Sequence, residues 1–159
     1  VIFHGFDSFI GLPEDWDLGS KYIKKERFSR DGKIPKVREN VQIYPGWFNE
    51  TIPVFLAEKT EKSISFLNID SDLYSSAITI LSDLNHLIKK GTIIRFDELA
   101  CWRTVFNEPS PTNEANRVLY PKWEEQEWKA LIEWVKKYNR RVVPISRDWH
   151  QSGTIIIIE

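Results

Sequence analysis

The chain has 159 residues, of which 42% are hydrophobic and 28% charged, with a formal net charge of −1 at pH 7. This length and composition predict a single globular domain over residues 1–159, and the near-neutral charge argues against a protein that binds nucleic acid through phosphate contacts. The single cysteine, Cys101, excludes an internal disulfide, and no apolar stretch reaches the roughly 18 residues of a membrane span. We therefore expect a cytoplasmic protein with neither a nucleic-acid nor a membrane partner.

Short apolar runs alternate with helical patterns along the chain, which predicts an α/β fold. The predicted strands cover residues 1–6, 41–44, 63–69, 91–96, 140–146 and 153–159, and the predicted helices cover residues 49–59, 74–91 and 124–139. The last two strands are close enough in sequence for an antiparallel hairpin. The connections 11–40 and 100–122 are long and polar, which is typical of functional or flexible loops.

Acidic residues follow several of the predicted strands. Asp70 and Asp72 come after the third strand, Asp97 and Glu98 end the fourth, and Asp7 ends the first. The helix between the third and fourth strands makes them parallel, so their carboxyl ends share one edge of the sheet. Open α/β sheets bind ligands at that edge.

Converging carboxylates repel each other unless a cation lies between them, and hard divalent cations prefer oxygen ligands. This pattern predicts a metal site at Asp70, Asp97 and Glu98. An alternative is that some of these acids cap helices, and Asp72 is well placed to cap the helix that follows it.

The segments GFDSFIGLPEDW, NVQIYPGWFNETIPVFL, ISFLNIDSDLYSSAITILSDL and IKKGTIIRFDE occur in this order. Together they resemble the macrocin/novobiocin-type O-methyltransferases, a branch of the class I S-adenosylmethionine-dependent methyltransferases. The resemblance covers Ile2 to about Glu98 well, and the tail from Trp123 more loosely. It implies a Rossmann-like sheet, mostly parallel, with a C-terminal antiparallel hairpin.

The resemblance also implies roles for individual residues. Asp7, with Ser8 and Phe9 beside it, matches the acid that binds the cofactor ribose, and Gly46, Trp47 and Phe48 match a segment near the adenine. Asp70, Asp97 and Glu98 match the family's metal ligands. Asp70 also matches the group that takes the proton from the acceptor hydroxyl.

One departure from the family is large. The family's first strand and its glycine-rich turn would precede Val1, so the resemblance implies a domain that is truncated at its N-terminus. The missing strand would lie between the strands at residues 1–6 and 63–69. We expect the gap to be closed, either by direct pairing of these two strands or by a second copy of the chain. We also expect this chain alone to bind S-adenosylmethionine weakly or not at all.

The resemblance implies an Mg²⁺-assisted O-methyltransferase, or a fragment of one, that acts on a hydroxyl of a sugar or small natural product. Two alternatives stay open. One is a non-catalytic methyltransferase-like remnant that self-associates, for example as a homodimer. The other is a metal-dependent glycosyltransferase that uses the Asp-x-Asp motif at residues 70–72, although the segments FDSF and GWF have no role in such an enzyme.

Overall fold

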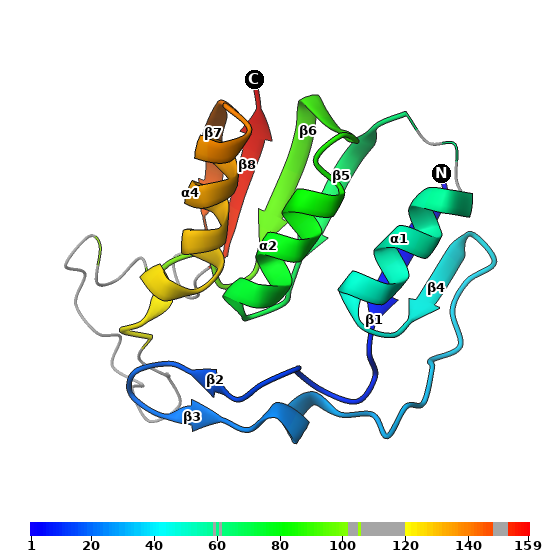
Figure 1. Cartoon of the computed structure of the whole chain (residues 1–159), viewed down its shortest axis with the longest axis horizontal. Coiled ribbons are helices and arrows are strands. Elements are labelled where there is room, and N and C mark those ends of the chain that lie inside the picture. Colours follow the sequence, from blue (N-terminus) through cyan, green and yellow to red (C-terminus); the bar gives the residue numbers. More distant parts are fainter. Residues whose placement is uncertain (59, 61, 102–104, 106–119, 148–152) are drawn as a thin grey trace.

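The computed structural model describes residues 1–58, 60, 62–101, 105, 120–147 and 153–159 (Figure 1). The helices and strands are, in chain order, β1 (Phe3–Asp7), β2 (Trp16–Asp17), β3 (Tyr22–Ile23), the 3-10 helix η1 (Lys25–Phe28), β4 (Val41–Pro45), α1 (Phe48–Glu58), β5 (Ile64–Ile69), α2 (Tyr74–Asp83), β6 (Ile88–Phe96), the 3-10 helix η3 (Trp123–Glu125), α4 (Glu127–Lys137), β7 (Val142–Arg147) and β8 (Thr154–Ile158). Each predicted strand and helix has a counterpart here, so the predicted α/β class is confirmed.

The main strands form two separate sheets. β1 and β4 make a parallel pair, and a second sheet has the order β5-β6-β8-β7. Within the second sheet β5 and β6 are parallel, whereas β8 runs antiparallel to both β6 and β7. The parallel crossover and the C-terminal antiparallel hairpin that the sequence predicts are therefore both confirmed.

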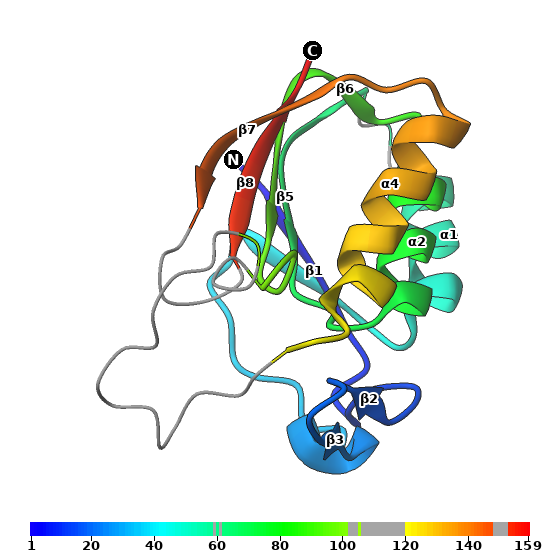
Figure 2. The ribbon, with the colours of Figure 1, turned by 90° about the vertical axis from the view of Figure 1, so that its left-hand side faces the viewer.

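The helices α1, α2 and α4 all cover the same face of the two sheets (Figure 2). One hydrophobic core joins them, because Ile52 of α1, Leu81 of α2 and Trp134 of α4 pack in one cluster with Ile94 of the second sheet. The opposite face is less well covered, and Phe66 on β5 remains 55% exposed.

The prediction of one helix over residues 74–91 is wrong in its C-terminal part. Helix α2 ends at Asp83, and Ile88 already begins β6, where it pairs with Ile64. Ile88 is fully buried. A β-branched residue packs well in a buried strand, and here Ile88 extends the sheet instead of the helix. Gly91 lies inside β6 with a φ of +89°, in the region where the register between β5 and β6 shifts.

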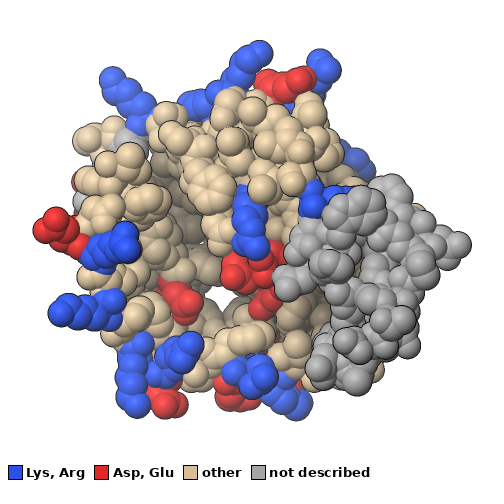
Figure 3. Space-filling model, turned by 180° about the vertical axis from the view of Figure 1, so that it is seen from behind, with Lys and Arg blue, Asp and Glu red and all other residues tan. Residues whose placement is uncertain are grey.

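The gap between the first and third predicted strands is not closed by direct pairing, so that form of the prediction is wrong. β1 and β5 belong to different sheets, and among the described residues no backbone hydrogen bond joins them. Figure 3 shows an opening through the molecule with acidic side chains at its rim. Closure by a second copy of the chain stays a prediction.

The long connection after β1 forms a small second core. β2 and β3 make a short hairpin, and Trp16 and Leu18 pack against Tyr120 and Trp123. An ion pair of 2.7 Å between Lys122 Nζ and Asp17 Oδ2 links the same two segments. Within the described part of the chain, no helix has the length and apolar character that crossing a membrane requires.

Candidate functional site

The ends of β1 and β4 lie next to each other at one edge of their sheet. Asp7 is opposite Pro45 in the register, and the Gly46 N–H donates a hydrogen bond of 2.9 Å to the Asp7 carbonyl. The Asp7 side chain is exposed. Its Oδ1 accepts a hydrogen bond of 2.6 Å from the Phe9 N–H, while its Oδ2 receives none from a described residue.

The turn between β4 and α1 brings Gly46, Trp47 and Phe48 to the same edge as Asp7. Gly46 has a φ of +140°, and a Cβ at this position would lie 2.9 Å from Thr51 Cγ2. Both the Thr51 N–H and its hydroxyl donate hydrogen bonds to the Trp47 carbonyl. The first turn of α1 therefore packs tightly against this segment, and the half-buried Trp47 lies one residue before the helix.

Three carboxylates converge where β5 and β6 end. Asp70, Asp72 and Glu98 each offer an oxygen, and these oxygens all lie within 4.8 Å of one another. Partial burial raises the pKa of Asp70, and the charges of Asp97 and Asp7 raise it further, although Arg95 lowers it. The strand ends that carry Asp7, Asp70 and Asp97 are thus close enough to interact electrostatically.

Asp72 does not cap α2, so that alternative is wrong. The helix's N-cap residue is Leu73, and the N–H of Tyr74, the first residue of the helix, donates a hydrogen bond of 2.9 Å to Gln126 Oε1 instead of to Asp72. Asp72 instead has a φ of +63° and is only 7% exposed. Burial, followed by the charges of Asp70 and Asp97, raises its pKa to about 7. No described residue donates a hydrogen bond to the Asp72 carboxylate, so its charge has no partner within the described chain.

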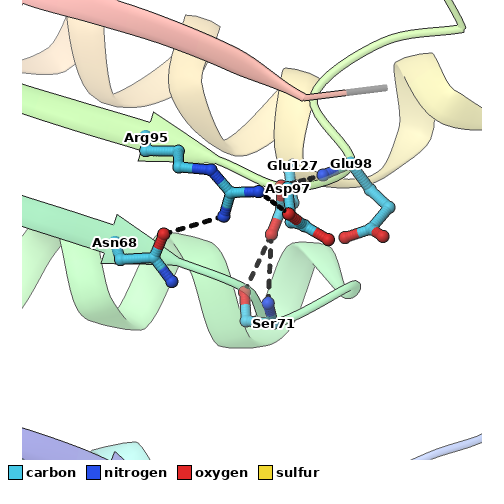
Figure 4. A network of polar contacts seen from close by, with 6 residues as sticks. All are labelled: Asn68, Ser71, Arg95, Asp97, Glu98 and Glu127. Carbon is cyan, nitrogen blue, oxygen red and sulfur yellow. Dashed lines mark hydrogen bonds and ion pairs between the residues drawn. The ribbon is translucent and has the colours of Figure 1, made fainter. Parts of the chain in front are cut away.

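Asp97 lies outside the group of converging oxygens. Buried Ile94 and Phe96 face the helices, and so Arg95 and Asp97 fall on the opposite face of β6. There Asp97 forms an ion pair with Arg95, which also donates a hydrogen bond of 2.8 Å to Asn68 (Figure 4). The ligand set implied by the resemblance stays a prediction. The geometry adds Asp72 as a candidate ligand.

Glu98 is less exposed to water than Asp70. Its Oε2 is buried without a hydrogen-bond partner in the described structure. Burial raises the pKa of Glu98, and so do the neighbouring charges, of which Asp72 contributes most. A buried carboxylate oxygen without a donor is costly unless it is protonated or paired with a cation.

Glu127 is a buried acid beside this cluster that the sequence interpretation did not identify. It is fully buried at the start of α4, and its carboxylate accepts hydrogen bonds from Ser71 and from the Glu98 N–H (Figure 4). It lies in the charged run EEQE, which is typical of a solvated helix start. Its spacing of i, i+4 and i+7 to Leu131 and Trp134 is the signal that could have placed it on the buried face.

The residues present fit a divalent cation and part of a nucleoside cofactor. The donor set Asp70, Asp72 and Glu98 consists of carboxylate oxygens, which suit Mg²⁺, and Glu98 Oε2 is buried without a hydrogen-bond partner among the described residues. The exposed Asp7 Oδ2 suits a ribose hydroxyl. Among the described residues, no strand pairs with both β1 and β5, which is where the resemblance would place the strand that precedes the glycine-rich turn.

The family model of macrocin-O-methyltransferase (TylF) matches the chain over residues 4–121. The matched residues include Asp7, the Gly46–Phe48 segment and the Asp70-x-Asp72 motif. This gives the motif a place in a methyltransferase and so argues against the glycosyltransferase alternative. No curated protein matches the chain significantly.

Solved O-methyltransferases share the fold. The structure of the O-methyltransferase NovP superposes with a TM-score of 0.60 at 19% sequence identity, covering 98% of this chain and 59% of that one. The calicheamicin methyltransferase CalS11 gives a TM-score of 0.66 at 20% identity, covering 98% of this chain and 60% of that one. The chain therefore spans about 60% of the length of these enzymes.

Proposed function

Since the chain belongs to the macrocin-O-methyltransferase (TylF) family, we propose that it contributes the metal and ribose sites of an O-methyltransferase that uses S-adenosylmethionine and Mg²⁺. The observation that carries this proposal is the convergence of Asp70, Asp72 and Glu98 at the ends of β5 and β6, where the charge of Asp7 at the end of β1 also acts on Asp70. Its acceptor would be a hydroxyl of a sugar or small natural product. CalS11, described as a TDP-rhamnose 3'-O-methyltransferase, is a structural neighbour of that kind.

The reaction transfers a methyl group from the cofactor sulfonium to the acceptor oxygen, and the acceptor hydroxyl gives up its proton. A bound divalent cation lowers the pKa of a hydroxyl that it contacts. In our proposal Asp70, the most exposed of the three acids, takes that proton. With a divalent cation bound, Asp72 and Glu98 would be ionised and would hold it from the protein side of the site, and Asp7 would orient the ribose through its Oδ2. The chain's single cysteine, Cys101, has no part in this chemistry.

The test begins with metal and cofactor binding, measured separately by calorimetry. We expect Mg²⁺ or Mn²⁺ to bind and to raise the melting temperature by mass action. Asp72→Asn and Asp97→Asn should be compared, because the geometry favours Asp72 as a ligand and the resemblance favours Asp97. A melting temperature that is the same with metal and with chelator would overturn the metal site.

Methyl transfer should then be assayed with labelled S-adenosylmethionine and a panel of nucleotide sugars and phenolic natural products. Asp70→Asn should remove whatever methyl transfer the unmodified chain shows while leaving the fold intact. Transfer that continues unchanged in Asp70→Asn would refute the role of Asp70.

The unpaired edges of β1 and β5 favour a second candidate, a methyltransferase-like domain that does not catalyse on its own and self-associates. This candidate predicts metal binding without measurable binding of S-adenosylmethionine. Tight cofactor binding by this chain alone would refute it, together with our expectation that the chain binds the cofactor weakly or not at all.

A further inference from the structure

The side chain of Glu127 on α4 forms hydrogen bonds with both segments that carry the converging acids, namely the one after β5 and the one after β6. Its Oε1 accepts hydrogen bonds of 3.2 Å from the Ser71 N–H and from the Ser71 hydroxyl, and its Oε2 accepts one of 3.3 Å from the Glu98 N–H. Ser71 lies between Asp70 and Asp72. One carboxylate therefore bridges the end of β5 to the end of β6 (Figure 4).

These contacts suit a carboxylate better than an amide. The two Glu127 oxygens face three donors, namely two backbone N–H groups and one hydroxyl. A glutamine has one acceptor oxygen, and its NH₂ group would point at a donor on one side.

The cluster that Glu127 supports has a second feature that indicates a ligand. Asp72 is more than nine-tenths buried, it contributes an oxygen to the group within 4.8 Å, and no described residue donates to its carboxylate. Asp70, Asp72 and Glu98 therefore form a set of converging acceptors to which no described residue donates a side-chain hydrogen bond.

We propose that Glu127 is the positioning residue of this site. By bonding Ser71 and the Glu98 backbone, it sets the separation of the two strand ends and so the spacing of the three acids, on which the affinity for a divalent cation depends. This proposal rests on the proposed function. Outer-sphere partners of this kind typically change metal affinity about 10- to 100-fold when they are lost.

The closing experiment measures Mn²⁺ affinity by calorimetry and by electron paramagnetic resonance, at a temperature where each variant is folded. Glu127→Gln should weaken Mn²⁺ binding about 10- to 100-fold and change the resonance spectrum of the bound ion. Glu133→Gln is the matched control, because Glu133 lies on the same helix and accepts a hydrogen bond of 2.6 Å from the Tyr74 hydroxyl of α2, without touching the acids. Its affinity should equal that of the unmodified chain.

A purely structural role would lower the melting temperature of Glu127→Gln but leave the Mn²⁺ affinity of the folded protein unchanged, and that result would overturn the proposal. If Glu127→Gln does not fold, Ser71→Ala decides, because it removes only the hydroxyl donor. It should weaken Mn²⁺ binding about 2- to 10-fold, and unchanged affinity would overturn the proposal. If the unmodified chain binds no Mn²⁺, the metal site of the proposed function is overturned and this inference with it. If the unmodified chain and Glu127→Gln bind Mn²⁺ equally well, only the inference is overturned.

Discussion

Asp72 combines a left-handed backbone conformation, near-complete burial and a carboxylate without a donor among the described residues. Non-glycine residues with positive φ are uncommon, and they concentrate at functional sites where the surrounding structure holds them in place. Asparagine accepts this conformation as readily as aspartate does. Asp72→Asn therefore removes the charge with little backbone cost.

The first prediction concerns the pH dependence of stability without metal. The pKa of Asp72 is raised to about 7 in the folded chain from 3.8, so the folded state holds this proton more tightly than the unfolded state does. The contribution of this proton binding to the free energy of unfolding is fully present below about pH 4. It is lost as the pH rises through about 7, because the buried carboxylate then ionises. Near pH 8, with a chelator present to remove metal, the free energy of unfolding of Asp72→Asn should be higher than that of the unmodified chain by up to about 4 kcal/mol, because the variant has no carboxylate to bury.

The control for this prediction is Asp31→Asn, because Asp31 also has a positive φ, of 54°, but is exposed. Its unfolding free energy, measured by urea denaturation from about pH 4 to about pH 8, should follow that of the unmodified chain. Added Mg²⁺ should stabilise the unmodified chain and Asp31→Asn but not Asp72→Asn. An Asp72→Asn protein that is no more stable than the unmodified chain near pH 8 would contradict the pKa argument.

At the scale of elements, helix α1 connects the two sheets. Its residues Ile52 and Phe55 pack in the main core, while Phe55 also makes an edge contact with Phe6 of β1, at 5.5 Å between ring centroids. The turn that begins α1 thus determines both how β1 and β4 join the rest of the domain and where Trp47 lies.

The second prediction compares two glycines with positive φ. Gly46→Ala should destabilise the chain by about 1–3 kcal/mol, because the new Cβ would meet Thr51 Cγ2 at 2.9 Å in addition to the backbone strain. Gly91→Ala should introduce backbone strain without a steric clash, since no atom lies within 4 Å of the position of its new Cβ. Urea denaturation should show the larger loss for Gly46→Ala. An equal loss in both variants would indicate that the α1 turn is not closely packed.

At the scale of the whole molecule, β1 pairs only with β4 and β5 only with β6, so among the described residues each strand has one edge without a neighbouring strand. Exposed edges promote pairing with another chain. The apolar side chains Phe3 on β1 and Phe66 on β5 are each 55% exposed, which adds a hydrophobic contribution to any such contact.

The third prediction is that the chain self-associates in a concentration-dependent way through these edges, as analytical ultracentrifugation would show. Phe66→Lys should reduce the association, because a charge on an edge strand opposes pairing. Ile145→Lys is the matched control on β7, at the far edge of the sheet, where Ile145 is 52% exposed. A monomer at every concentration, or an equal effect of the two variants, would contradict association through β5.

The sequence alone determined the α/β class, the order of the strands and helices, and the placement of Asp7, Asp70, Asp72, Asp97 and Glu98 at strand ends. These features follow from local periodicity and from the rule that a crossover helix makes two strands parallel. The family resemblance drawn from the same residues is confirmed by the match to macrocin-O-methyltransferase over residues 4–121.

Only the tertiary structure decided which acids face one another. Whether Asp72 caps a helix or joins Asp70 and Glu98 depends on one left-handed φ, and the pairing of Asp97 with Arg95 depends on the face of β6 that they share. Such orientations are set by packing between residues that are distant in sequence. Glu127 lies 56 positions from the Ser71 that it binds, and no local pattern in the chain records that contact.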